Sequence, residues 1–471
     1  MAKDMRSWID QLEEAGELIR IKDEVDPKMN MSGFLYQSKE RALLFENVKN
    51  HPGWKVLGQA PANMRHVGIA FGTKAKQAIT EFVRRMDQGL INCKMVNRGP
   101  VKEVILKDKD VHLTSLPAHI QGHKDAGPYI TSGLCIVKDP ETGVRNMAFH
   151  RLQVKGDNKL GIMMVPGRHT HLIHQKYEAM DQPMPIAIMI GHHPMYYLSA
   201  CYTGPLELDE LAIAGALFGE AVELIKCETI DLEAPAYGEI ILEGEIPPKI
   251  REEEGPFSEF QGYYFGGKGK NPVVHIKALT MRDDAIFKAN QNGPDTEGCI
   301  YHRVPMSAAL FRDLRHVGGY VDLKDVYAHW GTIFGVVIQM TPRFYGEAKN
   351  VLLASLSSTY LHQKFAIAVD EDVDIYDPAD VAWAMTTRVD PVKDIIIIPG
   401  VRGHALDESV TEKLREPKVK IRQELVSKVM IDATKPPTSD PERRAVYERL
   451  KPLGLETIGN HLSGFTEKMD S

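Results

Sequence analysis

The spacing of apolar residues near the N-terminus first favours a helix and then a strand. Asp4 is the predicted N-cap of a helix that places Trp8 and Leu12 on one face. Residues 18–25 then alternate between apolar and polar side chains, and residues 74–86 return to the helical spacing. Short helices and strands in this mixture predict a small α/β domain.

From about residue 111 the pattern changes to many short strand-like runs separated by glycine and proline. One predicted helix, at residues 208–217, interrupts them. Closely spaced strands of this kind indicate a barrel or a curled sheet. The strand-like runs cover residues 129–137, 147–154, 160–165, 186–190, 239–243 and 273–281.

After about residue 310, apolar strands alternate with amphipathic helices, which is typical of an α/β sandwich. A chain of 471 residues is also too long for one core. The sequence therefore predicts a multidomain α+β or α/β protein. The predicted parts are an N-terminal α/β domain (1–110), a central β-rich domain (111–310), a C-terminal α/β domain (311–439) and a helical tail (440–471).

Composition narrows the class of protein. A net charge of -7 and a pI near 6.2 argue against nucleic-acid binding, which needs a basic face, although a local basic pocket for a phosphate is still allowed. The five cysteines lie far apart without a CxxC pair, so a disulfide framework or thiolate zinc site is not expected. No signal-peptide core and no apolar run of roughly 20 residues is found, so we expect a cytoplasmic protein without a membrane span.

Residues 251–264 combine three consecutive glutamates, a Gly-Pro pair and a fourth carboxylate. A sharp turn between Glu254 and Glu259 can bring two acids together. Aromatic side chains at positions 257, 260, 263 and 264 offer apolar walls, in which neighbouring carboxylates repel and desolvate one another and at least one pKa rises. Such an acid can deliver protons near neutral pH. The alternative, a solvated acidic patch beside a turn, is the commoner outcome for a run of glutamates.

Three further segments offer oxygen and nitrogen ligands. Asn146 and Arg151 lie five residues apart, a Pro-Gly-Arg-His loop contains His169, and Glu210 opens a predicted helix. An amide oxygen, an imidazole and a carboxylate suit Mn²⁺ or Mg²⁺ with open positions for phosphate oxygens.

Each of these segments is a weak signal by itself. A histidine in a loop is more often a hydrogen-bonded surface residue, and acids at a helix start usually only cap it. His171 and His174 are as good candidates as His169 on residue type alone.

Several motifs nevertheless occur in one order along almost the whole chain. They are residues 146–151, the Pro-Gly-Arg-His loop at 166–169, Glu210 with the Ala-Gly-Ala that follows it, and residues 239–244, 254–260, 364–370, 386–391 and 431–434. Together they resemble the UbiD family of prenylated-FMN-dependent decarboxylases. The resemblance implies a central split β-barrel that binds the flavin and a C-terminal domain that forms homodimers or homohexamers.

The resemblance also implies a cofactor site. Asn146, His169 and Glu210 match the family's ligands for Mn²⁺ (or Mg²⁺), which joins the cofactor phosphate to the protein, with K⁺ nearby. In an acidic protein, the metal and Lys364 would neutralise that phosphate. The matching cofactor-binding positions are Asn146, Met147, Ala148, Phe149, His150, Arg151, Arg168, His169 and Lys364.

The catalytic positions follow from the same match. Glu259 takes the place of the proton donor, and Arg151 with Glu254 forms the ion pair that positions its carboxylate. Loss of CO₂ from an unsaturated carbon needs an electron sink, which the modified flavin supplies. Glu259, ionised while CO₂ leaves and protonated afterwards, would return a proton to the vacated carbon. The expected activity is the reversible, non-oxidative decarboxylation of an aromatic or heteroaromatic acid, with a flavin prenyltransferase supplying the cofactor.

Two departures bear on the details. Many family members have glycine where this chain has Ser258, which leaves the proton-donor role of Glu259 intact. The segments around His329 and His404 resemble the branch that acts on hydroxylated aromatic acids and imply substrate contacts. A lysine that this branch carries after its Ala-His is absent here, so furan, pyrrole and indole carboxylates stay open.

Two other functions remain as alternatives. The chain could be the cofactor-holding subunit of a carboxylase that depends on partner chains. It could also be a metal hydrolase that uses Asn146, His169 and Glu210 without flavin.

Overall fold

The computed structural model describes residues 4–265, 268–407, 409 and 425–454, which belong to two compact units. The first unit holds the described residues up to 309, together with residues 331–333 and those from 402 to 425. The second holds residues 310–330, 334–401 and those from 426 onward. No helix among the described residues is both long and apolar enough to cross a membrane.

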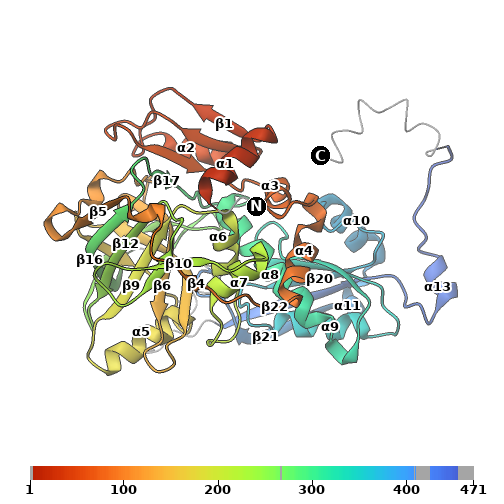
Figure 1. Ribbon diagram of the computed structural model, residues 1–471. Helices are drawn as coiled ribbons and strands as arrows, with labels where there is room; N and C mark the ends of the chain where they lie inside the picture. The colour runs from red at the N-terminus through yellow and green to blue at the C-terminus, as the bar shows by residue number, and fades with distance from the viewer. Residues whose placement is uncertain (1–3, 266–267, 408, 410–424, 455–471) are drawn as a thin grey trace. The chain divides into compact units, whose positions relative to one another are not determined.

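The N-terminal part of the first unit is a four-stranded sheet with helices packed on it (Figure 1). Its elements are α1 (Met5–Glu14), β1 (Leu18–Ile21), α2 (Met31–Gln37), β2 (Ala42–Phe45), β3 (Lys55–Gly58), α3 (Met64–Phe71), α4 (Ala78–Asp87) and β17 (Ile286–Lys288). The strand order is β1-β2-β3-β17, so the last strand comes from far along the chain. The predicted first helix is confirmed, because Asp4 caps α1 and Trp8 and Leu12 are buried.

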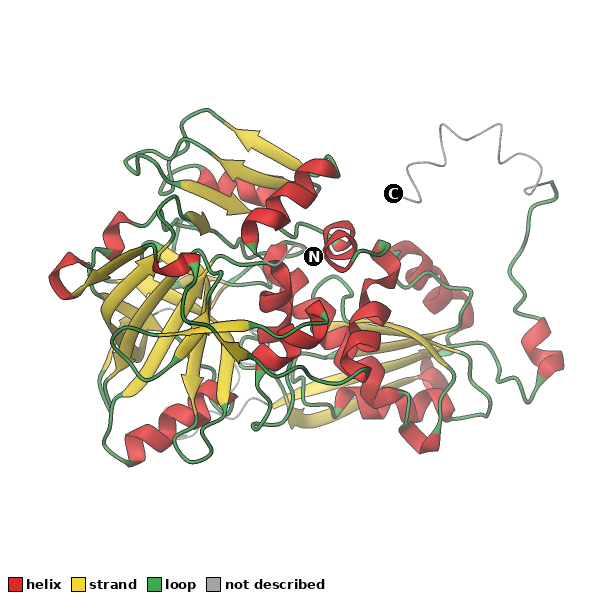
Figure 2. Cartoon of the chain, viewed as in Figure 1, coloured by secondary structure: helices red, strands yellow, loops and turns green. Residues whose placement is uncertain are grey.

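A closed antiparallel barrel of six strands forms the centre of this unit, drawn in yellow in Figure 2. The strands are β6 (Tyr129–Lys138), β7 (Arg145–Val154), β8 (Lys159–Ile162), β9 (Met184–Ile190), β12 (Ile240–Ile246) and β16 (Gly269–Met281). Their order is β12-β9-β6-β7-β8-β16, and pairing of β16 with β12 closes the ring. The predicted barrel is confirmed, and closure leaves none of these six strands as a free edge.

Shorter strands and four helices surround or extend the barrel. They are β4 (Lys94–Met95), β5 (Val104–Lys107), α5 (His169–Ala179), α6 (Pro194–Ala200), α7 (Glu210–Phe218), β10 (Glu223–Lys226), β11 (Glu233–Pro235), β13 (Arg251–Glu254), β14 (Phe257–Ser258), β15 (Tyr264–Phe265) and the start of α8 (Glu297–Leu314). β13 continues the sheet by pairing with β16. β7 and β13 lie on either side of β8 and β16 in the strand order, and residues about 100 positions apart in sequence meet where the Arg151 side chain on β7 bonds Glu254 on β13.

The second unit is a five-stranded α/β sheet in the order β18-β19-β20-β22-β21. Its elements are β18 (Leu323–Tyr327), β19 (Gly335–Met340), α9 (Glu347–Leu356), β20 (Phe365–Val369), α10 (Pro378–Arg388), α11 (Pro391–Asp394), β21 (Ile395–Arg402), β22 (Leu425–Ala433) and α13 (Pro441–Ala445). Parallel pairing of β19 with β20 and of β20 with β22 confirms the predicted alternation of strands and helices.

Some local predictions were wrong. Short helices α2 and α3 were missed, since seven or eight residues give few helical repeats to detect. The predicted helix at 74–86 begins as a 3₁₀ turn at Ala75–Gln77 and becomes α4. His169 begins α5 and does not lie in a loop, and the predicted helix at 440–450 is confined to α13.

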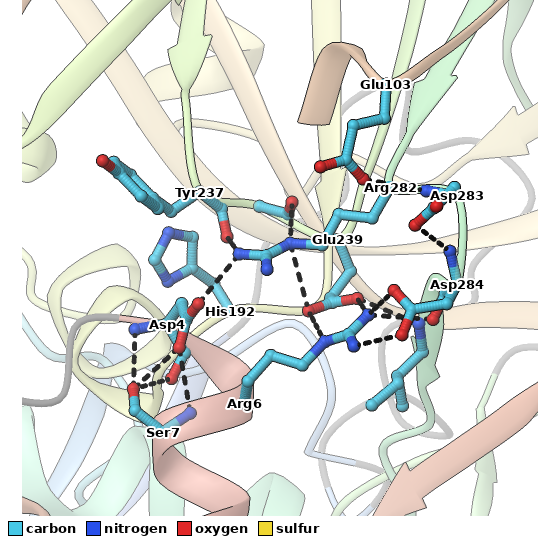
Figure 3. A network of polar contacts seen from close by, with 12 residues as sticks. Asp4, Arg6, Ser7, Glu103, His192, Tyr237, Glu239, Arg282, Asp283 and Asp284 are labelled. Atoms are coloured by element: carbon cyan, nitrogen blue, oxygen red, sulfur yellow. Dashed lines mark hydrogen bonds and ion pairs between the residues drawn. The ribbon is translucent and has the colours of Figure 1, made fainter. Parts of the chain in front are cut away.

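Buried ion pairs fasten α1 to the barrel (Figure 3). Glu239 is fully buried and accepts from Arg6 Nε at 3.1 Å, Arg6 Nη2 at 3.0 Å and the Ile286 amide at 2.9 Å. Arg6 Nη1 also donates to Asp284 at 2.6 Å. One carboxylate thus joins α1, the start of β12 and β17.

We expect replacement of Arg6 by Met to loosen α1. The Glu239 carboxylate would stay buried with two donors fewer, and breaking such a pair costs about 3 kcal/mol, or roughly hundredfold faster amide exchange in α1. Hydrogen exchange read by mass spectrometry measures this. Replacing Arg20 by Met, which breaks exposed pairs to Glu13 and Glu46, is the control and should change little. Equal exchange in both variants would contradict the role of Glu239.

Candidate active site

The acidic run at β13 divides between solvent and interior. Glu252 is partly exposed and pairs with Lys155 and Lys159, and Glu253 is exposed. Glu254, the next residue but one after Glu252, is 1% exposed. Both readings of the run are therefore correct, each for different residues. Glu253 and Glu254 point to opposite faces because alternate side chains of a strand do so, and Glu252, on the same face as Glu254, lies beside partly exposed lysines.

Arg151 on β7 bridges the two acids of the turn. Its Nε and Nη2 donate to the two oxygens of Glu254 at 3.1 Å and 2.8 Å, and its Nη1 donates to Glu259. The guanidinium also lies over the ring of Phe257, 5.0 Å from the centroid. Gly255 adopts a positive φ of 88° between the two acids, which a side chain would disfavour. The turn predicted from Gly-Pro brings Glu254 and Glu259 onto one arginine.

The carboxylate of Glu254 is saturated with donors. Besides the two bonds from Arg151, it accepts from the Tyr129 hydroxyl at 3.0 Å and from Asn271 Nδ2 at 2.9 Å. These four hydrogen bonds, two of them from a guanidinium, satisfy the buried carboxylate. Tyr129 on β6 and Asn271 on β16 were not found from the sequence, because only the barrel pairing brings them to β13.

Glu259 has a different environment. It is 7% exposed, and the only hydrogen bond that the described residues give its carboxylate comes from Arg151. Burial raises the pKa of Glu259, and the charges of Glu254 and Asp125 add to this, while Arg151 opposes it. A carboxyl group held in this way is suited to carry a proton.

A second cluster joins β7, α5 and α7. Glu210 is buried, and its oxygens accept from Asn146 Nδ2 at 2.9 Å and from the Met147 amide at 2.7 Å. His169 Nδ1 lies 3.9 Å from Glu210 Oε1. Burial raises the pKa of Glu210, and the nearby His169 opposes this. The structure thus gathers the three residues that the sequence singled out, and their amide, imidazole and carboxylate fit a hard divalent cation.

The neighbouring histidines point elsewhere. His171 Nδ1 accepts from the Gly167 amide at 3.4 Å, and His174 is buried 3.8 Å from Glu178. Thr170 donates to Asn146 Oδ1 at 2.9 Å and bonds His150 Nε2 at 3.1 Å, which orients the amide. Within the part of the chain that the structure describes, no group of three or more His, Cys, Asp and Glu could hold a metal, so a ligand set here requires the Asn146 amide.

Aromatic rings gather around Phe260, the residue after Glu259. Phe260 stacks on His302 at 6.3 Å and meets His404 edge-on at 6.2 Å. Burial, with Arg168 and His302 nearby, lowers the pKa of His404 to about 3, so its ring is neutral. His302 had not been picked out from the sequence. Lys364 and His329 belong to the second unit, where Lys364 precedes β20 and His329 follows β18.

The closed barrel, the arginine shared by two acids and the cluster of Asn146, His169 and Glu210 indicate a cofactor-dependent enzyme. Sequence profiles identify its family. The 3-octaprenyl-4-hydroxybenzoate carboxy-lyase N-terminal domain matches residues 9–86, the Rift-related domain matches residues 94–294, and the C-terminal domain matches residues 299–433. The chain belongs to the UbiD family and is a carboxy-lyase.

Relatives with assigned activities act on more than one kind of acid. The chain is 31% identical over 475 residues to the phenolic acid decarboxylase of Sedimentibacter hydroxybenzoicus, covering 96% of each protein. It is 33% identical over 405 residues to the anhydromevalonate phosphate decarboxylase of Methanosarcina mazei, covering 85% of this chain and 91% of that protein.

Solved structures share the fold over nearly the full length. The UbiD-class enzyme HmfF from Pelotomaculum thermopropionicum in complex with FMN has a TM-score of 0.87 and 33% identity, covering 98% of this chain and 100% of that one. An evolved dimeric form of HmfF in complex with prFMN gives 0.84 and 32%, with 97% and 98% covered. The 3,4-dihydroxybenzoic acid decarboxylase of Enterobacter cloacae gives 0.86 and 29%, with 98% and 99% covered.

We predict that Glu259→Gln stabilises the folded protein at alkaline pH relative to the unmodified chain. Because folding raises the pKa of Glu259, ionising it in the folded state costs free energy. This cost sets in above the unfolded value of 4.5 and is complete above the folded value. Thermal midpoints measured between about pH 4 and about pH 9 should diverge as pH rises.

Glu252→Gln is the control of opposite sign. Lys159 and Lys155 lower the pKa of Glu252 to about 2, so its contribution to stability is present above 4.5 and is lost as pH falls through about 2. This variant should lose a little stability at neutral pH. A Glu259→Gln variant that behaves in the same way would show that pairing with Arg151 outweighs burial.

Proposed function

We propose that this chain is a prenylated-FMN-dependent decarboxylase of an aromatic or heteroaromatic acid, with Glu259 as the proton donor. The observation that supports the proposal most directly is that two acids bonded to one guanidinium differ in the number of hydrogen bonds they accept. Glu254 has four donors, whereas Glu259 is buried with one. A carboxylate held by four donors beside an acid of raised pKa is the pattern of a fixed counter-ion and a proton carrier.

Asn146, His169 and Glu210 would hold Mn²⁺ or Mg²⁺ against the cofactor phosphate. Two features of the chain support this assignment. Asn146 Nδ2 donates a hydrogen bond to Glu210, and His169 Nδ1 lies 3.9 Å from Glu210 Oε1. The N-cap residue of α5, Arg168, makes no side-chain cap hydrogen bond. Free amides at a helix start favour an anion. We assign the remaining contacts to residues 146–151 and to Lys364.

The chain's own residues would divide the chemical work. Prenylated FMN, when bound, supplies the electron sink for the carbon that loses CO₂. Arg151, fixed by Glu254, would orient the substrate carboxylate and Glu259 together. Glu259, ionised while the bond to CO₂ breaks, would then take up a proton from solvent and deliver it to the vacated carbon.

The surroundings of Glu259 favour a flat substrate with a polar substituent. Phe260 offers a ring face, and neutral His302 and His404 can donate or accept hydrogen bonds at its edge. These ring contacts favour an aromatic acid as the substrate over anhydromevalonate phosphate, the compound in the name of the Methanosarcina relative.

Glu259→Gln should lower turnover by at least about a thousandfold, because the amide cannot supply the proton. The variant should still bind flavin. The measurement is chromatography of a panel of aromatic acids with protein co-expressed with a flavin prenyltransferase, alongside the cofactor absorbance spectrum. Glu253→Gln, which removes an exposed carboxylate from the same run, is the matched control and should remain active.

Other outcomes distinguish the alternatives. A fully active Glu259→Gln variant would remove Glu259 as proton donor. Flavin-loaded protein that turns over no acid until a partner chain is added would favour a cofactor-holding subunit. Metal without flavin would favour a hydrolase.

Glu210→Ala should lower both metal and flavin content. Loss of the carboxylate leaves only one amide and one imidazole, and we expect affinity for Mn²⁺ to fall by more than about tenfold. Metal analysis and flavin absorbance of the purified protein measure this. Glu207→Ala, an exposed position three residues earlier, is the control. Unchanged metal content in Glu210→Ala would place the cation elsewhere.

A further inference from the structure

A short segment, residues 122–126, holds the turn that carries Glu259. The Ala126 amide donates to the Pro256 carbonyl at 3.0 Å, and His123 Nδ1 lies 3.0 Å from the Tyr264 hydroxyl. Between these contacts, Asp125 reaches the residue immediately before Glu259. We call residues 122–126 the strap.

Asp125 uses both of its oxygens on this turn. Its Oδ1 accepts from the Ser258 amide at 2.8 Å, and its Oδ2 lies 3.2 Å from the Ser258 hydroxyl and 2.9 Å from the Gly122 amide. The amide bond restrains the backbone from which the Glu259 side chain departs. The hydroxyl contact depends on the serine that departs from the glycine expected from the family resemblance.

The strap also adds a third carboxylate near the two acids that Arg151 holds. The charge of Asp125 adds to burial in raising the pKa of Glu259, so a proton retained on one of the three acids relieves their repulsion. The number of hydrogen bonds that each carboxylate accepts indicates which acid keeps the proton. Glu254 accepts four hydrogen bonds and Asp125 three, while Glu259 accepts one. Burial raises the pKa of Asp125 as well, and the hydrogen bonds from Gly122 and Ser258 oppose this, whereas burial of Glu259 is opposed by Arg151. Glu259 is therefore the acid with the fewest donors to its charged form.

Three other titratable groups beside the turn are neutral. On β6, Tyr129 has a raised pKa through burial and the charge of Glu254, so it stays neutral. On the side of Phe260, burial lowers the pKa values of His302 and His404, and the charge of Arg168 adds to this. Among the described residues, Arg151 is the cation that bonds both Glu254 and Glu259.

We propose that Asp125 is a positioning residue for Glu259: it fixes the turn through Ser258, and its charge keeps the proton of the cluster on Glu259. This inference rests on the proposed function, since it explains how the proton donor takes up its proton for the protonation step of each turnover. Asp125 itself transfers no proton.

The test compares Asp125→Asn with Ser258→Gly in flavin-loaded enzyme. Asp125→Asn keeps one acceptor for the Ser258 amide and removes the charge, so the alkaline limb of the kcat–pH profile should move to lower pH by roughly one unit. Ser258→Gly keeps both the amide and the Asp125 charge, so its limb should stay in place. Asp110→Asn removes an exposed charge and serves as the control for net charge.

A second readout avoids dependence on turnover. Infrared titration of cofactor-free protein containing ¹³C-carboxyl glutamate, with Glu259→Gln subtracted, reports the protonation of Glu259 directly. The same shift is expected with Asp125→Asn. Folding of each variant is checked by circular dichroism.

The outcomes separate the two proposals. An unmoved Glu259 titration in folded Asp125→Asn overturns the inference and leaves the decarboxylase proposal standing. A shift in Ser258→Gly as large as that in Asp125→Asn overturns the charge effect. If flavin-loaded wild-type protein turns over no acid, the proposed function fails, and the infrared titration still decides the role of Asp125.

Discussion

Sharing of the Arg151 guanidinium by Glu254 and Glu259 is the interaction on which the active site depends. A buried arginine requires compensating acceptors, and two buried acids require donors. One guanidinium cannot satisfy both carboxylates equally. It binds Glu254 through two nitrogens and Glu259 through one, so the geometry of a single side chain sets the two acids apart.

The closed barrel makes that arrangement possible. Arg151 lies on β7, Tyr129 on β6, Glu254 on β13 and Asn271 on β16. Antiparallel pairing fixes each strand against its neighbour, and ring closure fixes the register of all of them. The same strand β7 carries Asn146, which meets Glu210 and His169, so one strand serves both the acid cluster and the proposed metal site.

Stability and the proposed function oppose each other at Glu259. A carboxyl group buried with a single donor is an unfavourable element of a folded protein, and the raised pKa is the direct expression of that cost. The supporting contacts differ in kind. Those around Glu254 satisfy every acceptor, and those of Asp125 fix the backbone of the turn, so the unfavourable environment is confined to one residue.

The sequence by itself determined the periodic features of this protein. Alternation of apolar residues gave the barrel strands, the cap at Asp4 gave α1, and the Gly-Pro pair gave the turn between Glu254 and Glu259, because all of these depend on residues close together in the chain. Ordered motifs also pointed to Asn146, Arg151, His169, Glu210 and Glu259. Only the tertiary structure distinguished Glu254 from its solvated neighbours, placed His169 nearest Glu210, and introduced Tyr129, Asn271 and Asp125. Burial and hydrogen-bond partners come from strands far apart in sequence, and local spacing does not encode them.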